Sequence, residues 1–150
     1  MSWDAIFGAA NMLAMISWAA LILLPRWPAL LSALLYLVVG LLSLLYAGIL
    51  VGLFTGLADP GGSLAGGNFS SIEGVQTLFS AKGGLTMGWV HYLAFDLFVG
   101  IWTARDADAK GFSRFVQAPI LVATFMAGPL GLLLWLLLRE PRARASGRWS

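Results

Sequence analysis

Three side chains that could do acid–base chemistry lie close together in one apolar stretch, residues 88–102. Asp96 falls near the middle of this stretch, and His91, the only histidine of the chain, is followed directly by Tyr92. An ionised carboxylate at the centre of a membrane helix costs about 2.5–3.5 kcal/mol on insertion scales, so Asp96 must find a partner or stay protonated. A protonated carboxyl suits a general acid. We predict Asp96, His91 and Tyr92 as the catalytic residues; the alternative for Asp96 is a structural role, with Asp96 donating a hydrogen bond to a backbone carbonyl near Pro129.

Helical spacing separates the three candidates. At 100° per residue, His91 and Asp96 lie roughly 140° apart, so both can line one cavity only if their helix is central in the bundle. Tyr92 precedes Asp96 by four residues, so the two share a face and can hydrogen-bond. His91 lines up instead with Phe95, an arrangement equally typical of a packed core histidine.

Few other polar groups occur inside the apolar stretches, and we predict that a small set contacts a bound molecule beside the catalytic group. The predicted substrate contacts are Trp89, Phe95, Asn11 and Thr124. Such a site suits acid–base chemistry on, or binding of, an apolar molecule with a few oxygens. With one histidine and no cysteine, the chain lacks the ligands of a bis-histidine haem, a di-iron cluster or an iron–sulfur centre, so we expect no metal and no cofactor.

An acidic pair, Asp106 and Asp108, stands between Arg105 and Lys110. Two carboxylates two residues apart could ligate a metal ion. Acidic residues interleaved with basic ones are more typical of a solvated, self-neutralising loop. We therefore predict a compact charged turn over residues 105–111 and no metal site there.

The composition places these residues in a membrane protein. The chain has 150 residues, of which 59% are hydrophobic and only 11% are charged, whereas a soluble domain carries about a quarter charged residues. We predict an all-α fold, a four-helix transmembrane bundle over residues 1–138, followed by a basic tail over residues 139–150. The net charge of +2 is too small and too scattered to indicate nucleic-acid binding.

Four apolar stretches have the length that a membrane span requires. We expect the spans at residues 5–24, 29–54, 85–103 and 117–138. Pro25 and Pro28 predict a tight turn between the first two spans. Pro129, flanked by Gly128 and Gly131, predicts a kink near the middle of the fourth span.

The long connection over residues 57–84 carries a short amphipathic segment. Ser70 and Glu73 fit a capping box with Ser70 as the N-cap, which predicts a helix lying on the membrane surface and ending near residues 82–84. We favour a role as an anchor for the loop over a role as a lid. Before it, Gly48, Gly52 and Gly56 recur at a spacing of four; we favour close packing inside the bundle over contact with a second copy or a partner enzyme.

The expected topology leaves the orientation almost undetermined. Four spans put both termini on one side, with five basic residues there and four on the other, and we lean towards cytoplasmic termini. The first residues carry no basic group, so we expect the first apolar helix to be retained and not cleaved as a signal peptide. We therefore expect a multi-pass protein that resides in the bacterial cytoplasmic membrane.

The third and fourth stretches resemble a known family. The most distinctive residues are Trp89, His91, Ala94, Asp96 and Leu97; Asp106, Pro119, Thr124-Phe125, Gly128-Pro129 and Gly131-Leu132 follow in the same order. This pattern resembles the abscisic-acid-deficient-four-like family of small four-helix membrane proteins from plants, algae and bacteria. The absence of a plastid-type transit segment before the first helix indicates a bacterial-type member.

The resemblance implies a substrate class and a reaction. Plant members are required for neoxanthin synthesis, which implies isomerisation of an epoxycarotenoid, violaxanthin, to an allene without a redox cofactor. The reaction needs an acid at the epoxide oxygen and a base at the departing proton, and Asp96 and His91 are the first assignment to test.

Two other functions remain open from the residues. One is a non-catalytic membrane protein that binds carotenoid or lipid, or assists a partner enzyme. The other is a proton-coupled carrier built on Asp96, which the scarcity of polar residues in the first two spans disfavours.

Overall fold

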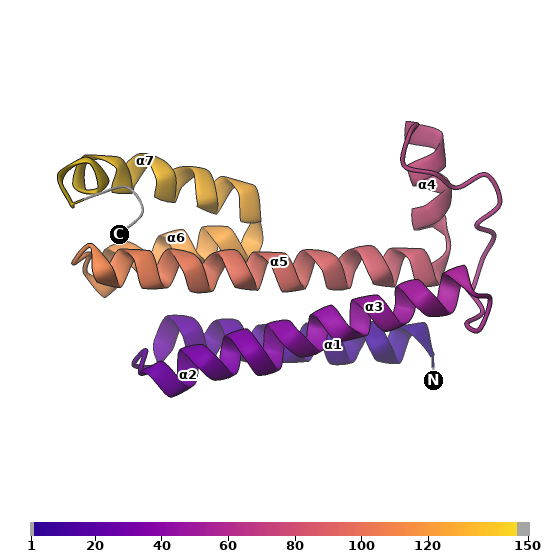
Figure 1. The fold of residues 1–150 in the computed structure, drawn as a ribbon, viewed down its shortest axis with the longest axis horizontal. Helices are drawn as coiled ribbons and strands as arrows, with labels where there is room; N and C mark the ends of the chain where they lie inside the picture. Colours follow the sequence, from indigo (N-terminus) through magenta and orange to yellow (C-terminus); the bar gives the residue numbers. More distant parts are fainter. Residues whose placement is uncertain (1, 147–150) are drawn as a thin grey trace.

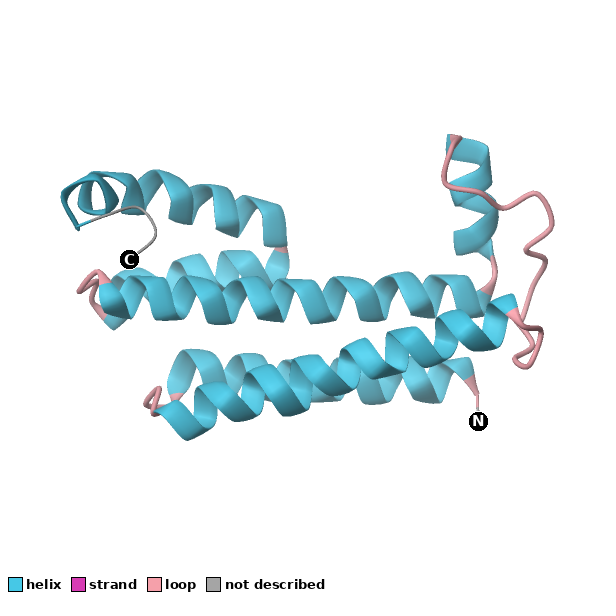
Figure 2. Cartoon of the chain, in the orientation of Figure 1, coloured by secondary structure: helices cyan, strands magenta, loops and turns pink. Residues whose placement is uncertain are grey.

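The computed structural model describes residues 2–146, and every regular element in that range is a helix (Figures 1 and 2). The first helix, α1, spans Trp3–Leu23, and the Ser2 hydroxyl caps it by accepting from the backbone N–H of Ala5. Leu24 is already extended, because a residue before proline disfavours helical geometry.

The second apolar stretch forms one continuous rod made of three parts. It begins with α2 (Pro28–Ser32), continues through a π-helical stretch, η1 (Ala33–Val39), and ends with α3 (Gly40–Phe54). The N–H of Gly40 bonds to the carbonyl of Leu35, the i→i+5 pattern that widens the helix. The rod lies antiparallel to α1, as the proline-bounded turn predicts (Figure 1).

The helix predicted in the long connection is α4 (Ile72–Ser80), which stands crosswise to the start of α5 and projects away from α1 and α3 (Figure 1). Its N-cap is Ser71 and not Ser70: the Ser71 hydroxyl accepts from the N–H of Gly74 at 3.0 Å. Ser70 instead donates both its backbone N–H and its hydroxyl to the Oδ1 atom of Asn68. The predicted cap was therefore wrong by one residue.

The longest helix, α5 (Lys82–Ala109), is the centre of the molecule (Figure 1). It packs against α1, η1, α3, α4, α6 and α7. It also extends past the predicted span, so Arg105, Asp106 and Asp108 belong to its last turns and not to a loop. The turn itself comes at Lys110–Gly111, where Gly111 has a φ of 66°.

The fourth apolar stretch does not form one kinked span. It forms two helices, α6 (Arg114–Met126) and α7 (Gly128–Ser146), which fold back on each other at Ala127 (Figure 1). Pro129 removes a backbone donor and disfavours helix in the residue before it, which accounts for an interruption here. A β-carbon at Gly131 would overlap Thr124, so the glycine lets the two helices approach closely enough to reverse.

The hairpin changes the topology. Within residues 2–146, three helical stretches are long and apolar enough to cross a membrane, Trp3–Leu23, Pro28–Phe54 and Lys82–Ala109, whereas α6 is shorter. The start of α1 and the end of α7 therefore lie at opposite ends of the molecule (Figure 1). The expectation of both termini on one side depended on a fourth crossing, which the helices of residues 2–146 do not support.

The predicted basic tail overlaps the end of the hairpin. Helix α7 continues to Ser146, so residues 139–146 of the predicted tail are helical. Residues 147–150, including Arg148, lie outside the described range.

The three glycines at a spacing of four, Gly48, Gly52 and Gly56, lie in three different environments. A β-carbon at Gly48 would meet nothing within 4 Å, whereas one at Gly52 would contact Ala58. Gly56 adopts a φ of 73° just after α3 ends. Of these three glycines, only Gly52 serves close internal packing. The alternative, contact of Gly48 with a second copy or a partner enzyme, remains a prediction.

Candidate functional site

Helix α5 presents the predicted catalytic residues on two different sides. The His91 ring lies 5.6 Å from that of Tyr46 and 4.5 Å from that of Phe95. Asp96 faces the reversal between α6 and α7 instead. The two candidates therefore belong to separate environments, as the angle between them predicts.

The Asp96 carboxyl fits against the tip of the hairpin. A β-carbon at Gly128 would overlap it, so the missing side chain of Gly128 makes the space that Asp96 occupies. The Oδ2 atom is buried, and it has no hydrogen-bond partner among the described residues. An unpaired buried carboxyl oxygen is costly, so a polar group of a bound molecule that reached this oxygen would be favoured there.

Tyr92 reaches the same tip from one turn earlier. Its hydroxyl donates to the Phe125 carbonyl at 3.4 Å, a long hydrogen bond. This carbonyl lies four residues before Pro129, which has no N–H to offer it. Tyr92 and Asp96 thus meet the hairpin together, and His91 does not.

An aromatic row leads up to this pair. The Phe7 ring stacks on Trp89 at 5.6 Å, and Trp89 stacks on Tyr92 at 5.1 Å. Asn11 holds the row in place, because its Oδ1 accepts from the Trp89 indole at 3.0 Å while its Nδ2 donates to the Phe7 carbonyl. Asn11 therefore acts on the site through Trp89.

The face of α5 that carries Tyr92 and Asp96 is bounded at both ends. One turn before Tyr92, a β-carbon at Gly88 would overlap the ring of Phe79, which comes from α4. Eight residues later, Asp96 abuts Gly128 at the start of α7. At 1.5 Å per residue these limits are about 12 Å apart along the helix. Gly88, Tyr92 and Asp96 thus lie in one row on this face, which we call the strip. It carries the Tyr92 ring, on which Trp89 stacks, and it ends in the Asp96 carboxyl.

The predicted substrate contacts divide accordingly. Trp89 and Asn11 join the strip, whereas Phe95 lies with His91 on the other side. Thr124 is fully buried, and its hydroxyl donates to the Ile120 carbonyl one turn earlier. Thr124 packs against Gly131 inside the hairpin and is positioned to hold α6 and α7 together.

A buried ionic cluster joins α5 to the hairpin, where a solvated turn was predicted. The Asp106 carboxylate pairs with Arg139 at 2.6 Å and Lys110 at 2.8 Å, and it accepts from the Trp135 indole at 3.0 Å. Its side chain is only 10% exposed. The prediction of a solvated pair was wrong for Asp106, because the folded-back α7 brings Arg139 and Trp135 over it.

Asp108 enters a second ionic contact, with the turn between the first two helical rods. The Arg26 guanidinium pairs with Asp108 at 3.1 Å and also donates to Gln117. Burial lowers the pKa of Arg26, and the nearby charge of Asp108 opposes that shift. Within residues 2–146 no three His, Cys, Asp or Glu side chains gather as a metal site would require. These residues tie the helices together, and only the contacts across the fold reveal them.

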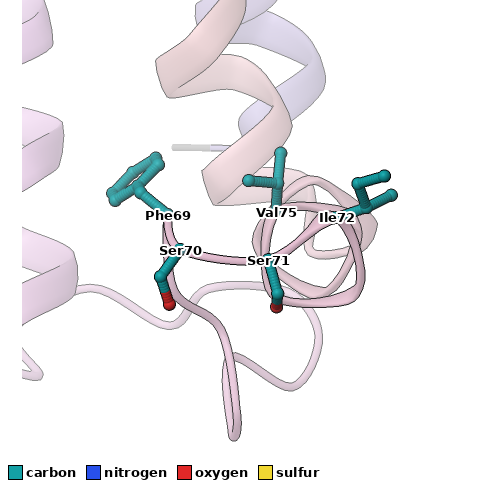
Figure 3. Close-up of a pocket in the computed structure, with 5 residues that line it drawn as sticks. All are labelled: Phe69, Ser70, Ser71, Ile72 and Val75. Carbon is teal, nitrogen blue, oxygen red and sulfur yellow. The ribbon is translucent and has the colours of Figure 1, made fainter.

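Two pockets lie near α4, at the end of the molecule opposite to the ionic contacts of Asp106 and Asp108. Figure 3 shows Phe69, Ile72 and Val75 around a shallow pocket at the start of α4, with the Ser70 and Ser71 hydroxyls pointing away from the apolar groups. A second, more apolar cavity of about 260 Å³ lies between α3, α4 and α5, lined in part by Leu53, Leu78 and Met87. Neither contains the Asp96 carboxyl.

The fold and this site define a class of protein: a small, strongly apolar helical protein with three potential membrane spans and a carboxyl at the tip of a half-length helical hairpin. Comparison with known families matches residues 5–135 to the ABA DEFICIENT 4-like family. The chain belongs to this family, as the residue pattern of the third and fourth stretches predicts. No curated protein and no solved structure matched it significantly.

Proposed function

We propose that this protein binds an oxygenated carotenoid or a related isoprenoid in the membrane and isomerises its epoxide by acid–base chemistry. Family membership supplies the substrate class. The observation that carries the site is the strip on α5, which ends at an Asp96 oxygen without a partner among the described residues. A flat polyene can lie along Trp89 and Tyr92 and bring one oxygenated ring to Asp96.

We assign the base as well as the acid to Asp96, because the His91 ring packs on Tyr46 and Phe95 on another side of α5. In this reaction Asp96 gives its proton to the epoxide oxygen, and the bond between that oxygen and the ring carbon bearing the polyene breaks. The neighbouring polyene carbon then loses its proton, and the electrons of that C–H bond form the second double bond of the allene. The oxygen and this hydrogen sit on adjacent carbons, so the two oxygens of one carboxyl can serve both. Asp96 ends protonated again, and no other reactant is consumed.

Tyr92 positions the acid in this scheme. Its hydroxyl stands one turn from Asp96 and anchors to the Phe125 carbonyl, which fixes the ring beside the carboxyl. Trp89, held by Asn11, supplies the flat surface on which the conjugated chain rests.

The direct test uses full-length protein in detergent or vesicles with violaxanthin, followed by chromatography of the products. We expect wild-type protein to form the allenic isomer, and Asp96→Asn to bind the pigment but form no product. Asp4→Asn is the matched control, because Asp4 lies on the exposed surface paired with Lys82. Full turnover by Asp96→Asn would exclude this mechanism.

A non-catalytic carotenoid- or lipid-binding accessory is the second candidate. The fit of Asp96 against Gly128 favours it, since a carboxyl that fills a packing position can serve the fold alone. Purification from a carotenoid-producing host separates the two functions. Bound pigment without product from any tested epoxycarotenoid would support the accessory.

We also propose that the protein resides in a bacterial cytoplasmic membrane. The three long apolar helices support a membrane location. Fractionation of the native host would test the compartment.

A further inference from the structure

The hairpin concentrates basic residues at one end of the molecule. Because α7 turns back, its basic residues lie with the end of α5 and the turn before α2 (Figure 1). This end holds seven of the eight basic residues in the described range, against three acidic ones. The basic residues there are Arg26, Arg105, Lys110, Arg114, Arg139, Arg142 and Arg144.

The opposite end has the reverse balance. It holds one basic residue, Lys82, and three acidic ones, Asp4, Asp59 and Glu73. Positively charged residues near the ends of spans favour the cytoplasmic side of a membrane. A seven-to-one distribution replaces the near tie expected for four spans and favours a cytoplasmic basic end. That end then faces a leaflet that carries anionic phospholipids.

A groove opens at this basic end between η1 and α5. It has a volume of about 370 Å³, with Pro28, Leu31 and Leu35 as its apolar wall. Its polar lining consists of Arg26, Ser32, Tyr36 and Arg105. The groove therefore combines two cations, two hydroxyls and an apolar wall, the features of a site for a charged headgroup joined to hydrocarbon.

Arg105 is the cation available to a ligand. It is exposed, and within residues 2–146 it makes no hydrogen bond or ion pair, whereas Arg26 is already bonded to Asp108, Gln117 and two carbonyls. A guanidinium binds a phosphate through paired, charge-assisted hydrogen bonds. The groove thus offers an unused phosphate ligand at the expected depth of the headgroups.

The local backbone and the neighbouring surface fit the rest of a lipid. Leu35 and Tyr36 of the groove belong to the π-helical stretch, and such widened turns occur frequently at functional sites. Beyond Tyr36, the same rod continues towards the middle of its length with the exposed side chains of Leu37, Leu41 and Leu44. An acyl chain can follow this apolar surface while its phosphate stays at Arg105.

We propose that the groove between η1 and the C-terminal end of α5 binds the headgroup phosphate of an anionic phospholipid, with Arg105 as its principal contact. Ser32 and Tyr36 donate hydroxyl hydrogen bonds to the phosphate or glycerol oxygens. This site is separate from Asp96, so the proposal does not depend on the carotenoid chemistry proposed for Asp96.

Native mass spectrometry of the full-length protein, titrated with phosphatidylglycerol in detergent, tests the site. We expect one preferentially retained lipid per protein and a roughly tenfold or greater rise in apparent Kd for Arg105→Gln. Arg144→Gln is the matched control, because it removes an equal charge from the same end outside the groove, and we expect a change within about twofold. Ser32→Leu should weaken binding by filling the groove without changing the charge.

Three results would overturn the proposal. The first is equal binding by wild type, Arg105→Gln and Ser32→Leu. The second is equal retention of phosphatidylcholine, since the site is expected to favour a net negative lipid. The third is displacement of the lipid by inorganic phosphate at equal concentration, which would mean that the acyl chains contribute nothing.

Discussion

The carboxyl of Asp96 occupies the space that a side chain at Gly128 would fill. This one contact joins the middle of the central helix to the reversal between α6 and α7. It gives Asp96 a packing role and a reactive position at once, because the carboxyl fits against the hairpin while one oxygen stays without a partner in residues 2–146.

Gly128→Ala should loosen the hairpin. The new methyl group overlaps Asp96, so we expect a loss of about 1–3 kcal/mol in stability, measured by thermal or denaturant unfolding in detergent. Gly48→Ala is the control, because nothing lies within 4 Å of its β-carbon and alanine improves helix propensity by about 1 kcal/mol. Equal stability of the two variants would mean that the hairpin tip does not pack on Asp96.

His91→Gln should leave turnover of an epoxycarotenoid within about twofold of wild type, since the His91 ring packs on Tyr46 and Phe95 away from Asp96. Trp89→Leu, which removes the platform beside Tyr92, should instead raise KM. Loss of product in His91→Gln, with folding intact, would restore histidine as the base and refute the single-carboxyl mechanism.

Asp106→Asn should destabilise the protein strongly. The change leaves Arg139 and Lys110 facing a neutral amide inside the cluster, and removal of one partner of a buried ion pair costs about 3–5 kcal/mol. The exposed pair of Asp4 with Lys82 provides the comparison, with an expected loss below about 1 kcal/mol for Asp4→Asn. Similar melting temperatures for both variants would count against a structural cluster.

The orientation can be measured with single cysteines, because the chain has none of its own. Ser113→Cys lies in the turn at the basic end, and Ser63→Cys lies in the long loop at the other end. In intact bacterial cells whose outer membrane has been made permeable, a membrane-impermeant maleimide should label Ser63→Cys alone. Labelling of Ser113→Cys alone would reverse the expected orientation.

Much of the fold follows from local sequence, and the site follows from it in part. Pro25 and Pro28 mark the first turn, and the spacing of Tyr92 and Asp96 correctly puts them on one face. The cap at Ser71 is missed because the Asn68 side chain engages Ser70, a local competition that the capping pattern does not resolve.

The hairpin and the ionic cluster could not be read in the same way. Pro129 predicts an interruption, but whether the chain bends or reverses depends on Gly131 meeting Thr124 and Gly128 meeting Asp96. Asp106 and Arg139 are 33 residues apart, so their pairing exists only once the chain has reversed.

The half-length hairpin also gives the molecule an uneven cross-section. At the basic end the rods of α1, α2–η1, α5, α6 and α7 lie side by side, whereas beyond the tip only α1, α3 and α5 continue through the apolar part (Figure 1). In a bilayer such a body is a wedge that displaces more lipid area from one leaflet than from the other.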